Sequence, residues 1–152
     1  MAMDWNAVGA VGEILGAVAV LLTLLYLAAQ IRQANKMAHF ETTREIMAQF
    51  NACNHLIATE PTIREVLLKE GDLSVDESEQ LYSYVDMYCN AWATTQFAFD
   101  QGLVEKPVWA GVMKDVEVTM NRWPSMRQPA ETWLSNYPDF KDSEIFKAID
   151  QH

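Results

Sequence analysis

The sequence predicts an all-α protein in which a single N-terminal transmembrane helix continues into a bundle of about five further helices. Three observations lead to this prediction. Residues 14–29 form a run of sixteen amino acids without a charged side chain. No glycine or proline interrupts residues 17–60. The rest of the chain places its apolar residues at helical spacing, and we find no period-two alternation that would predict a strand.

The apolar run is long enough to cross a bilayer. Residues 11–31 supply 21 amino acids, and a helix needs about 20 to cross the hydrocarbon core. Glu13 lies near the outer end, where burial of a carboxylate costs less than at the bilayer centre. The alternative is a buried central helix of a soluble bundle, because such helices are also apolar on all sides. We predict an anchor over residues 1–31 and a helical domain over residues 32–152.

The charges around the apolar run predict its orientation. Asp4 precedes the run without any Lys or Arg, whereas Arg32 and Lys36 follow it directly. Since basic residues favour the cytoplasmic side, we expect the N-terminus outside and the C-terminal domain in the cytoplasm. An acidic N-terminus is also unlike that of a secretory signal peptide. Trp5 and Tyr26 are the aromatic residues expected at the two membrane interfaces.

Small residues recur along the predicted anchor at steps of four, three and four, which places them on one helix face. They are Gly12, Gly16, Ala19 and Thr23, and the two glycines form a GxxxG motif. Such a stripe lets two helix backbones approach closely. Glu13 adds a carboxyl group, which faces either a protein partner or the water of the headgroup region. We expect these five residues to form the helix contact of a homo-oligomer, or of a subunit of a larger complex, within the lipid bilayer.

Two segments of the anchor resemble those of a known family. Gly-Ala-Val-Ala-Val at residues 16–20 and Leu-Tyr-Leu-Ala-Ala-Gln-Ile-Arg-Gln at residues 25–33 are similar to the N-terminal signature of a family of small, uncharacterised bacterial proteins. Further apolar and aromatic landmarks that match lie at residues 60–61, 102–109 and 133–140. The resemblance implies one helix in the bacterial inner (cytoplasmic) membrane and a helical cytoplasmic domain, and it implies no activity. That family has Asn directly after Ile-Arg-Gln, whereas this chain has Ala34.

Helix signals also divide the remainder of the chain. The long helix is expected to continue to residue 60, with an apolar stripe at Phe40, Met47, Phe50, Cys53 (or Asn54) and Ile57. A short helix over 63–70 is expected to end at Gly71. Ser74 and Glu77 form a capping box for a helix over 75–101. Three further helices are predicted, one between the turn at 102–109 and the break at 121–124, one over 130–136 and one over 143–150.

The helix over residues 75–101 carries an aromatic stripe. Its apolar positions at helical spacing are Leu81, Val85, Tyr88, Trp92, Thr95 and Phe99. A stripe of this kind forms either the core of a bundle or the lining of a ligand pocket. In the second case the domain is a small-molecule sensor or enzyme. The predicted pocket residues are then Tyr84, Tyr88, Trp92, Phe99 and Trp109.

The charge and the missing motifs exclude several function classes. The chain has 21 acidic and 11 basic residues and a net charge of −10, so we expect no nucleic-acid partner. It contains no CxxC, ExxH or HExxH pattern, no phosphate-binding glycine loop and no GxSxG elbow. Cys53 and Cys89 are too few for a disulfide framework and are expected to be reduced and buried.

The histidines offer no metal site within one chain. His39 and His55 lie sixteen residues apart on one predicted helix, which is about 24 Å along its axis. Cys53 and His55 point to different sides of that helix, which argues against a catalytic dyad. We therefore expect no cofactor and no enzymatic activity. The sequence favours a membrane-anchored interaction protein, self-associating or an accessory subunit of a membrane complex.

Overall fold

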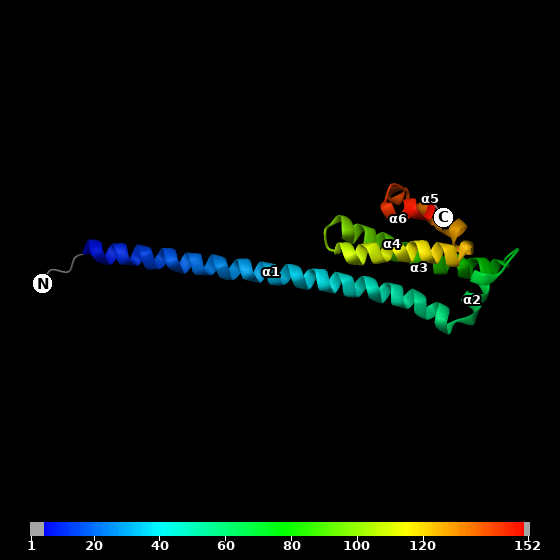
Figure 1. Cartoon of the computed structure of the whole chain (residues 1–152), viewed down its shortest axis with the longest axis horizontal. Helices are drawn as coiled ribbons and strands as arrows, with labels where there is room; N and C mark the ends of the chain where they lie inside the picture. The colour runs from blue at the N-terminus through cyan, green and yellow to red at the C-terminus, as the bar shows by residue number, and fades with distance from the viewer. Residues whose placement is uncertain (1–4, 151–152) are drawn as a thin grey trace. The chain divides into compact units, whose positions relative to one another are not determined.

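The computed structural model describes residues 5–150, with the side chains of residues 5, 7 and 150 left out, and it confirms the all-α fold (Figure 1). Its described part contains six α-helices, two short 3-10 helices and no strand. The elements are α1 (Trp5–Thr59), α2 (Pro61–Leu68), α3 (Val75–Asp100), α4 (Lys106–Arg122), η1 (Pro124–Met126), α5 (Arg127–Asn136), η2 (Pro138–Phe140) and α6 (Glu144–Asp150).

The chain divides into two compact units, Met1–Ala38 and His39–His152. The predicted anchor ended at residue 31, where the apolar run stops, and the observed division lies seven residues further on. His39 explains the position of this division. Its Nδ1 atom lies 3.0 Å from the carbonyl oxygen of Leu103, and its side chain is the first in α1 that is not fully exposed among those described. Residues 39–59 of α1 therefore belong to the helical domain.

Local sequence features determine where α1 and α2 end. The helix α1 ends at Thr59, one residue before the predicted limit, and Pro61 occupies the first turn of α2. Proline suits that position because its missing N–H group would have no partner there. The helix α2 ends at Leu68, two residues earlier than predicted, because Lys69 is already extended (φ −68°, ψ 126°). Gly71 then turns the chain with φ +102°, a value that favours glycine.

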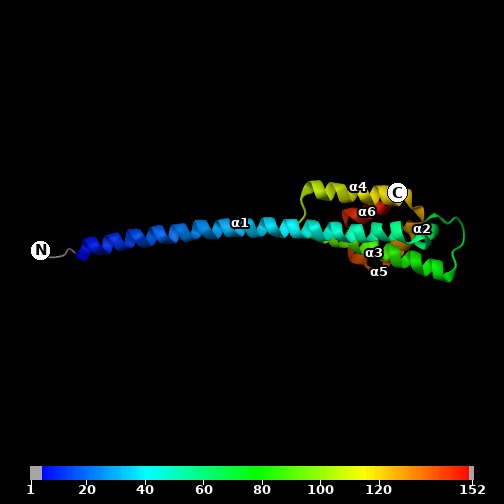
Figure 2. The same cartoon turned by 90° about the horizontal axis from the view of Figure 1, so that it is seen from below.

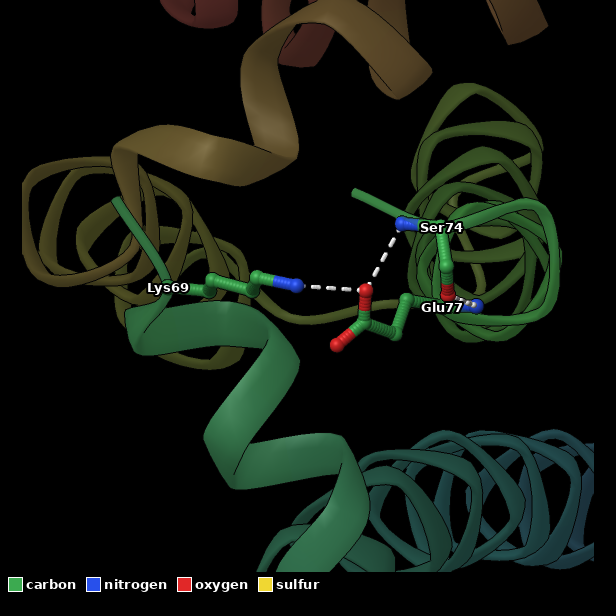
Figure 3. A network of polar contacts seen from close by, with 3 residues as sticks. All are labelled: Lys69, Ser74 and Glu77. Atoms are coloured by element: carbon green, nitrogen blue, oxygen red, sulfur yellow. Dashed lines mark hydrogen bonds and ion pairs between the residues drawn. The ribbon is translucent and has the colours of Figure 1, made fainter. Parts of the chain in front are cut away.

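The capping box at the start of α3 is confirmed, and Figure 3 shows its contacts. The Ser74 hydroxyl accepts a hydrogen bond from the Glu77 N–H at 3.3 Å, and the Glu77 carboxylate accepts one from the Ser74 N–H at 2.7 Å. Lys69, just after α2, adds an ion pair to the same Glu77 oxygen at 2.6 Å. The hydrogen bond from Lys69, together with those from Ser74, lowers the pKa of Glu77 from 4.5 to about 2.

The helix α3 is the centre of the helical domain. It contacts α2, α4, α5 and α6, and Val85, Cys89 and Trp92 on it are 0% exposed. Residues 39–59 of α1 run along the outside of α3 and α4 (Figure 2). Both cysteines are free and buried, as predicted. Ile145, Phe146 and Ile149 of α6 also face the core as predicted, together with residues of every other α-helix in the domain.

Two polar side chains of the core attach α6 to the rest of the domain. Gln96 of α3 is only 4% exposed, and its Oε1 atom accepts a hydrogen bond from the Ile145 N–H at 3.3 Å. Trp109 of α4 donates its indole N–H to Glu144 at 3.3 Å. The buried amide of Gln96 is tolerated because it accepts a hydrogen bond from an N–H group in the first turn of α6. N–H groups at this end of a helix have no acceptor within the helix itself.

The apolar stripe predicted for the second part of α1 is partly wrong. Phe50 and Cys53 are buried and Ile57 is half-buried, but Phe40 is 61% exposed and Met47 is 41% exposed. Ile46, which was not predicted, is 1% exposed. Positions 46, 50, 53 and 57 follow steps of four, three and four and form one face. Because Ile46 and Met47 are neighbours and both apolar, only the packing decides which of them enters the core.

Replacing Ser74 with alanine tests the cap of α3. We expect Ser74→Ala to lower the free energy of unfolding by about 1 kcal/mol, because the Glu77 N–H loses its acceptor. The measurement is urea unfolding of the intact chain in detergent micelles, followed by circular dichroism. Ser78→Ala is the matched control, since Ser78 is one turn further on and its side chain has no described hydrogen bond. Equal unfolding midpoints for the two variants would contradict the role of the cap.

Lowering the pH should weaken the same cap. Because the pKa of Glu77 is lowered on folding from 4.5 to about 2, its contribution to stability is present above the unfolded value and is lost as the pH falls through the folded value. We expect the difference in urea midpoint between the natural chain and Glu77→Gln to be largest above about pH 5 and to disappear toward pH 2. A difference that is independent of pH would show that the carboxylate charge is not involved.

Candidate functional site

The N-terminal unit presents an uncovered apolar surface. Every side chain that the structure describes from residue 8 to residue 38 is exposed. The large apolar side chains between positions 8 and 31 have exposed fractions between 49% and 64%. Within residues 5–150, one helix is long and apolar enough to cross a membrane: it is the Val8–Thr59 part of α1. Its most apolar window of 18 residues has a mean hydropathy of 2.3 and is 0% buried within the chain.

The predicted stripe of small residues lies on this surface, and no other described part of the chain covers its glycines. A Cβ atom added at Gly12 or Gly16 would meet no atom within 4 Å. Nothing within the described chain therefore requires glycine at either position. The Thr23 hydroxyl donates a hydrogen bond to the Ala19 carbonyl at 2.9 Å, so the stripe carries no unsatisfied donor. Glu13 lies about 100° around the helix from Gly12, so it is at the edge of the stripe.

Both aromatic residues predicted to lie at the membrane interfaces belong to α1, and the structure describes the side chain of Tyr26. Tyr26 is 63% exposed on α1. Trp5 begins α1, but its side chain lies outside those that the structure describes. The backbone of α1 is continuous through the whole apolar run. All the backbone polar groups of this run are therefore hydrogen-bonded within the helix, which is a requirement for crossing a bilayer.

The five residues of the predicted aromatic pocket lie in two groups. Tyr84, Tyr88 and Trp92 form a row on α3, with ring centroids 5.4 and 5.3 Å apart. Phe99 stacks on Trp109 of α4, with centroids 4.2 Å apart and planes 8° from parallel. Four of the five are buried in the hydrophobic core, and Phe99 packs against it half-buried. These rings stabilise the contacts of α3 with α1 and α4.

The hydroxyl groups of this row point toward α1. Tyr84 donates to the Cys53 carbonyl at 3.4 Å, and Tyr88 donates to the Asn54 side-chain oxygen at 3.0 Å. Burial raises the pKa of Tyr88 to about 12, the pKa of Cys53 to about 11, and the pKa of Cys89 as well. The Tyr88 phenol and the two thiols are thus protonated at neutral pH. A cysteine that acts as a thiolate nucleophile needs a lowered pKa instead.

A polar cleft lies beside the aromatic row, and we call it the α4 cleft. It has a volume of about 490 Å³ and is lined from α1, α2, α3 and α4 and by Trp123, which follows α4. Its polar side chains include Asn54, Arg64, Tyr88, Asp115 and Arg122. Only Tyr88 belongs to the pocket that the sequence predicts. Since the other residues come from three different helices, the folded domain is needed to bring them together.

The charged groups of the α4 cleft have no ionic partners among the described residues. The ion pairs that the structure describes are Glu41–Arg44, Lys69–Glu77 and Lys114–Glu117. Asp115 is half-buried, and its Oδ2 atom is buried without a hydrogen-bond donor. Burial raises the pKa of Asp115, and the nearby indole N–H of Trp92 opposes this shift without making a well-oriented hydrogen bond.

The two arginines of the cleft are held by neutral groups. An Nη atom of Arg64 donates to the Ile57 carbonyl at 2.9 Å. The guanidinium carbon of Arg122 lies 4.9 Å from the centre of the Trp123 ring, in a cation–π contact. Both side chains are exposed at the rim. The described part of the chain contains no group of three His, Cys, Asp or Glu residues that could hold a metal ion.

Comparison of the chain with protein-family models, curated proteins and solved structures finds no match. The resemblance of residues 16–20 and 25–33 to a bacterial family therefore stays a prediction. Two surfaces of the described chain are candidates for a functional role. These are the exposed apolar face of α1 and the α4 cleft of the helical domain.

Proposed function

We propose that this protein is a single-pass membrane protein, with the helical domain acting as an interaction module. The uncovered apolar surface of residues 8–31 carries the proposal. About a dozen large apolar side chains lie there, and exposing each to water costs about 1.5 kcal/mol or more. The sum is on the order of 20 kcal/mol, which exceeds the stability of an ordinary domain. A lipid environment removes this cost.

The dimensions and charges of α1 support a membrane span. Residues 11–31 correspond to about 31 Å of helix, close to the ~30 Å thickness of the hydrocarbon core. Arg32 and Lys36 follow at once, and the N-terminal side has no basic residue. This asymmetry favours a cytoplasmic helical domain, in a bacterium at the inner membrane. The acidic charge of the domain keeps it off anionic lipid.

The stripe of Gly12, Gly16, Ala19 and Thr23 is the surface through which we expect the anchor to associate. Since no part of the described chain packs on the glycines, a second helix can approach their backbone closely. Glu13 at the edge of the stripe can donate or accept a hydrogen bond across such a contact. The partner is either a second copy of this chain or a helix of a larger membrane complex. No catalytic role is needed.

Membrane extraction tests the anchor. We expect the full chain, produced in a bacterium, to stay in the membrane pellet after alkaline carbonate treatment and to enter the supernatant only with detergent. Charging the middle of the run with Val18→Arg and Leu21→Arg should release the protein, because arginine at mid-bilayer costs about 3 kcal/mol per residue. Val118→Arg, at an exposed position of α4, is the control and should stay in the pellet. Release of the natural chain by carbonate would reject the anchor.

Enlarging the glycines tests the stripe. We expect Gly12→Leu with Gly16→Leu to shift the assembly to a smaller size in native electrophoresis after mild detergent extraction, because the added side chains separate the backbones. The matched control is Ala10→Leu with Ala17→Leu, which adds similar bulk on the opposite side of the helix. The same size for all three proteins would exclude the stripe as the interface. Proteins that co-purify with the natural chain, but not with the glycine variant, would identify a larger complex.

A further inference from the structure

We propose that the α4 cleft binds one of the common amino acids and recognises it as a small zwitterion through its amino and carboxylate groups. The cleft contains one carboxylate and two guanidinium groups that form no ion pair with each other. Its remaining wall is largely apolar. The proposal does not depend on the membrane anchor, since every residue that carries it lies in the unit His39–His152.

The acidic side of the cleft lacks a donor. The Oδ2 atom of Asp115 is enclosed by the protein, and the indole N–H of Trp92 lies close to it. The Oδ1 atom is not enclosed and has no described hydrogen bond, and Asp115 lines the cleft. A half-buried carboxylate without a donor is unfavourable. A ligand ammonium group carries three donors and a positive charge, so it would satisfy the Oδ1 atom. A ligand with only negative charge would be repelled by it.

The basic side of the cleft offers donors in a defined orientation. The bond from Arg64 to the Ile57 carbonyl uses one of the five N–H groups of its guanidinium. Arg122 is oriented by the ring of Trp123, which leaves the edge of its guanidinium for a carboxylate. Arginine binds carboxylates through two parallel hydrogen bonds. The rim of the cleft is thus suited to the acidic group of the ligand.

The separation of the two charges suits a short ligand. Asp115 and Arg122 are seven residues apart on α4, so they share one face with about 10.5 Å between them along the axis. Helical side chains lean toward the N-terminus, and the long side chain of Arg122 therefore leans toward Asp115. Both residues line the same cleft, so one small ligand can contact both. Tyr88 of the neighbouring helix α3 lines the same cleft between these two charged residues and α1.

The apolar wall selects the rest of the ligand. Ile57, Val118 and Trp123 line the cleft beside the charged groups. They provide a surface for an aliphatic or aromatic side chain. The volume of about 490 Å³ is within the usual range for small-molecule sites. Asn54, which accepts from Tyr88 at 3.0 Å, adds a further polar group at the floor.

Thermal unfolding of the intact protein in lipid nanodiscs, with each of the twenty common amino acids, tests the site. Nanodiscs avoid free detergent that would occupy an apolar cleft. We expect at least one apolar or aromatic amino acid to raise the unfolding temperature. Calorimetry then compares it with the same compound lacking the amino group and with the one lacking the carboxylate. Each analogue should bind at least tenfold more weakly, because one side of the cleft loses its partner.

Variants of the cleft complete the test. Asp115→Asn and Arg122→Met should each weaken binding at least tenfold, while Lys114→Met, on the same helix outside the lining, should leave it unchanged. Circular dichroism and the unfolding temperature without ligand verify that each variant is folded. The proposal is overturned if no amino acid binds, or if the acid without an amino group binds equally well, which would indicate a simple anion site. Undiminished binding by a folded Asp115→Asn variant would also overturn it.

Discussion

The rest of the structure depends on the continuity of α1. An apolar segment that crosses a bilayer must satisfy its own backbone hydrogen bonds, because lipid offers no donors or acceptors. A single helix without a break meets this requirement from Trp5 to Thr59. The same helix then supplies Ile46, Phe50 and Cys53 to the core of the helical domain. One helix thus combines an apolar run long enough to cross a bilayer with a packed face of the helical domain, and its described side chains change from exposed to partly buried at His39.

The helical domain is organised around α3, and the α4 cleft lies beside the core that α3 forms. The row of Tyr84, Tyr88 and Trp92 stabilises the contact of α3 with α1 by packing and by two hydroxyl hydrogen bonds. Tyr88, the middle residue of this row, also lines the α4 cleft, together with charged residues of α2 and α4. Charged groups without ionic partners beside a packed core are a favourable arrangement for ligand binding, since the polar groups are already positioned.

Much of the fold follows from local sequence signals. Pro61 and the pair of Ser74 and Glu77 begin helices through local chemistry, as predicted, whereas α2 ends at Leu68, two residues before the predicted end, and Gly71 turns the loop that follows. The candidate sites are less accessible from sequence. Lys69 joins the cap of α3 only because α2 ends beside it. Asp115 and Arg122 share a helix face at a spacing of seven, which is the one signal of the α4 cleft in the sequence.

The sequence by itself determined the all-α class, the uncharged run of α1, the helix boundaries to within three residues and the absence of common catalytic motifs. These depend on composition and on contacts between near neighbours, which are present in the sequence itself. Only the tertiary structure decided that Ile46 rather than Met47 enters the core, that the predicted aromatic residues form two groups, and that Arg64 and Asp115 line one cleft. The physical reason is that these outcomes depend on how helices distant in sequence pack, and neighbouring apolar residues give no preference for one packing.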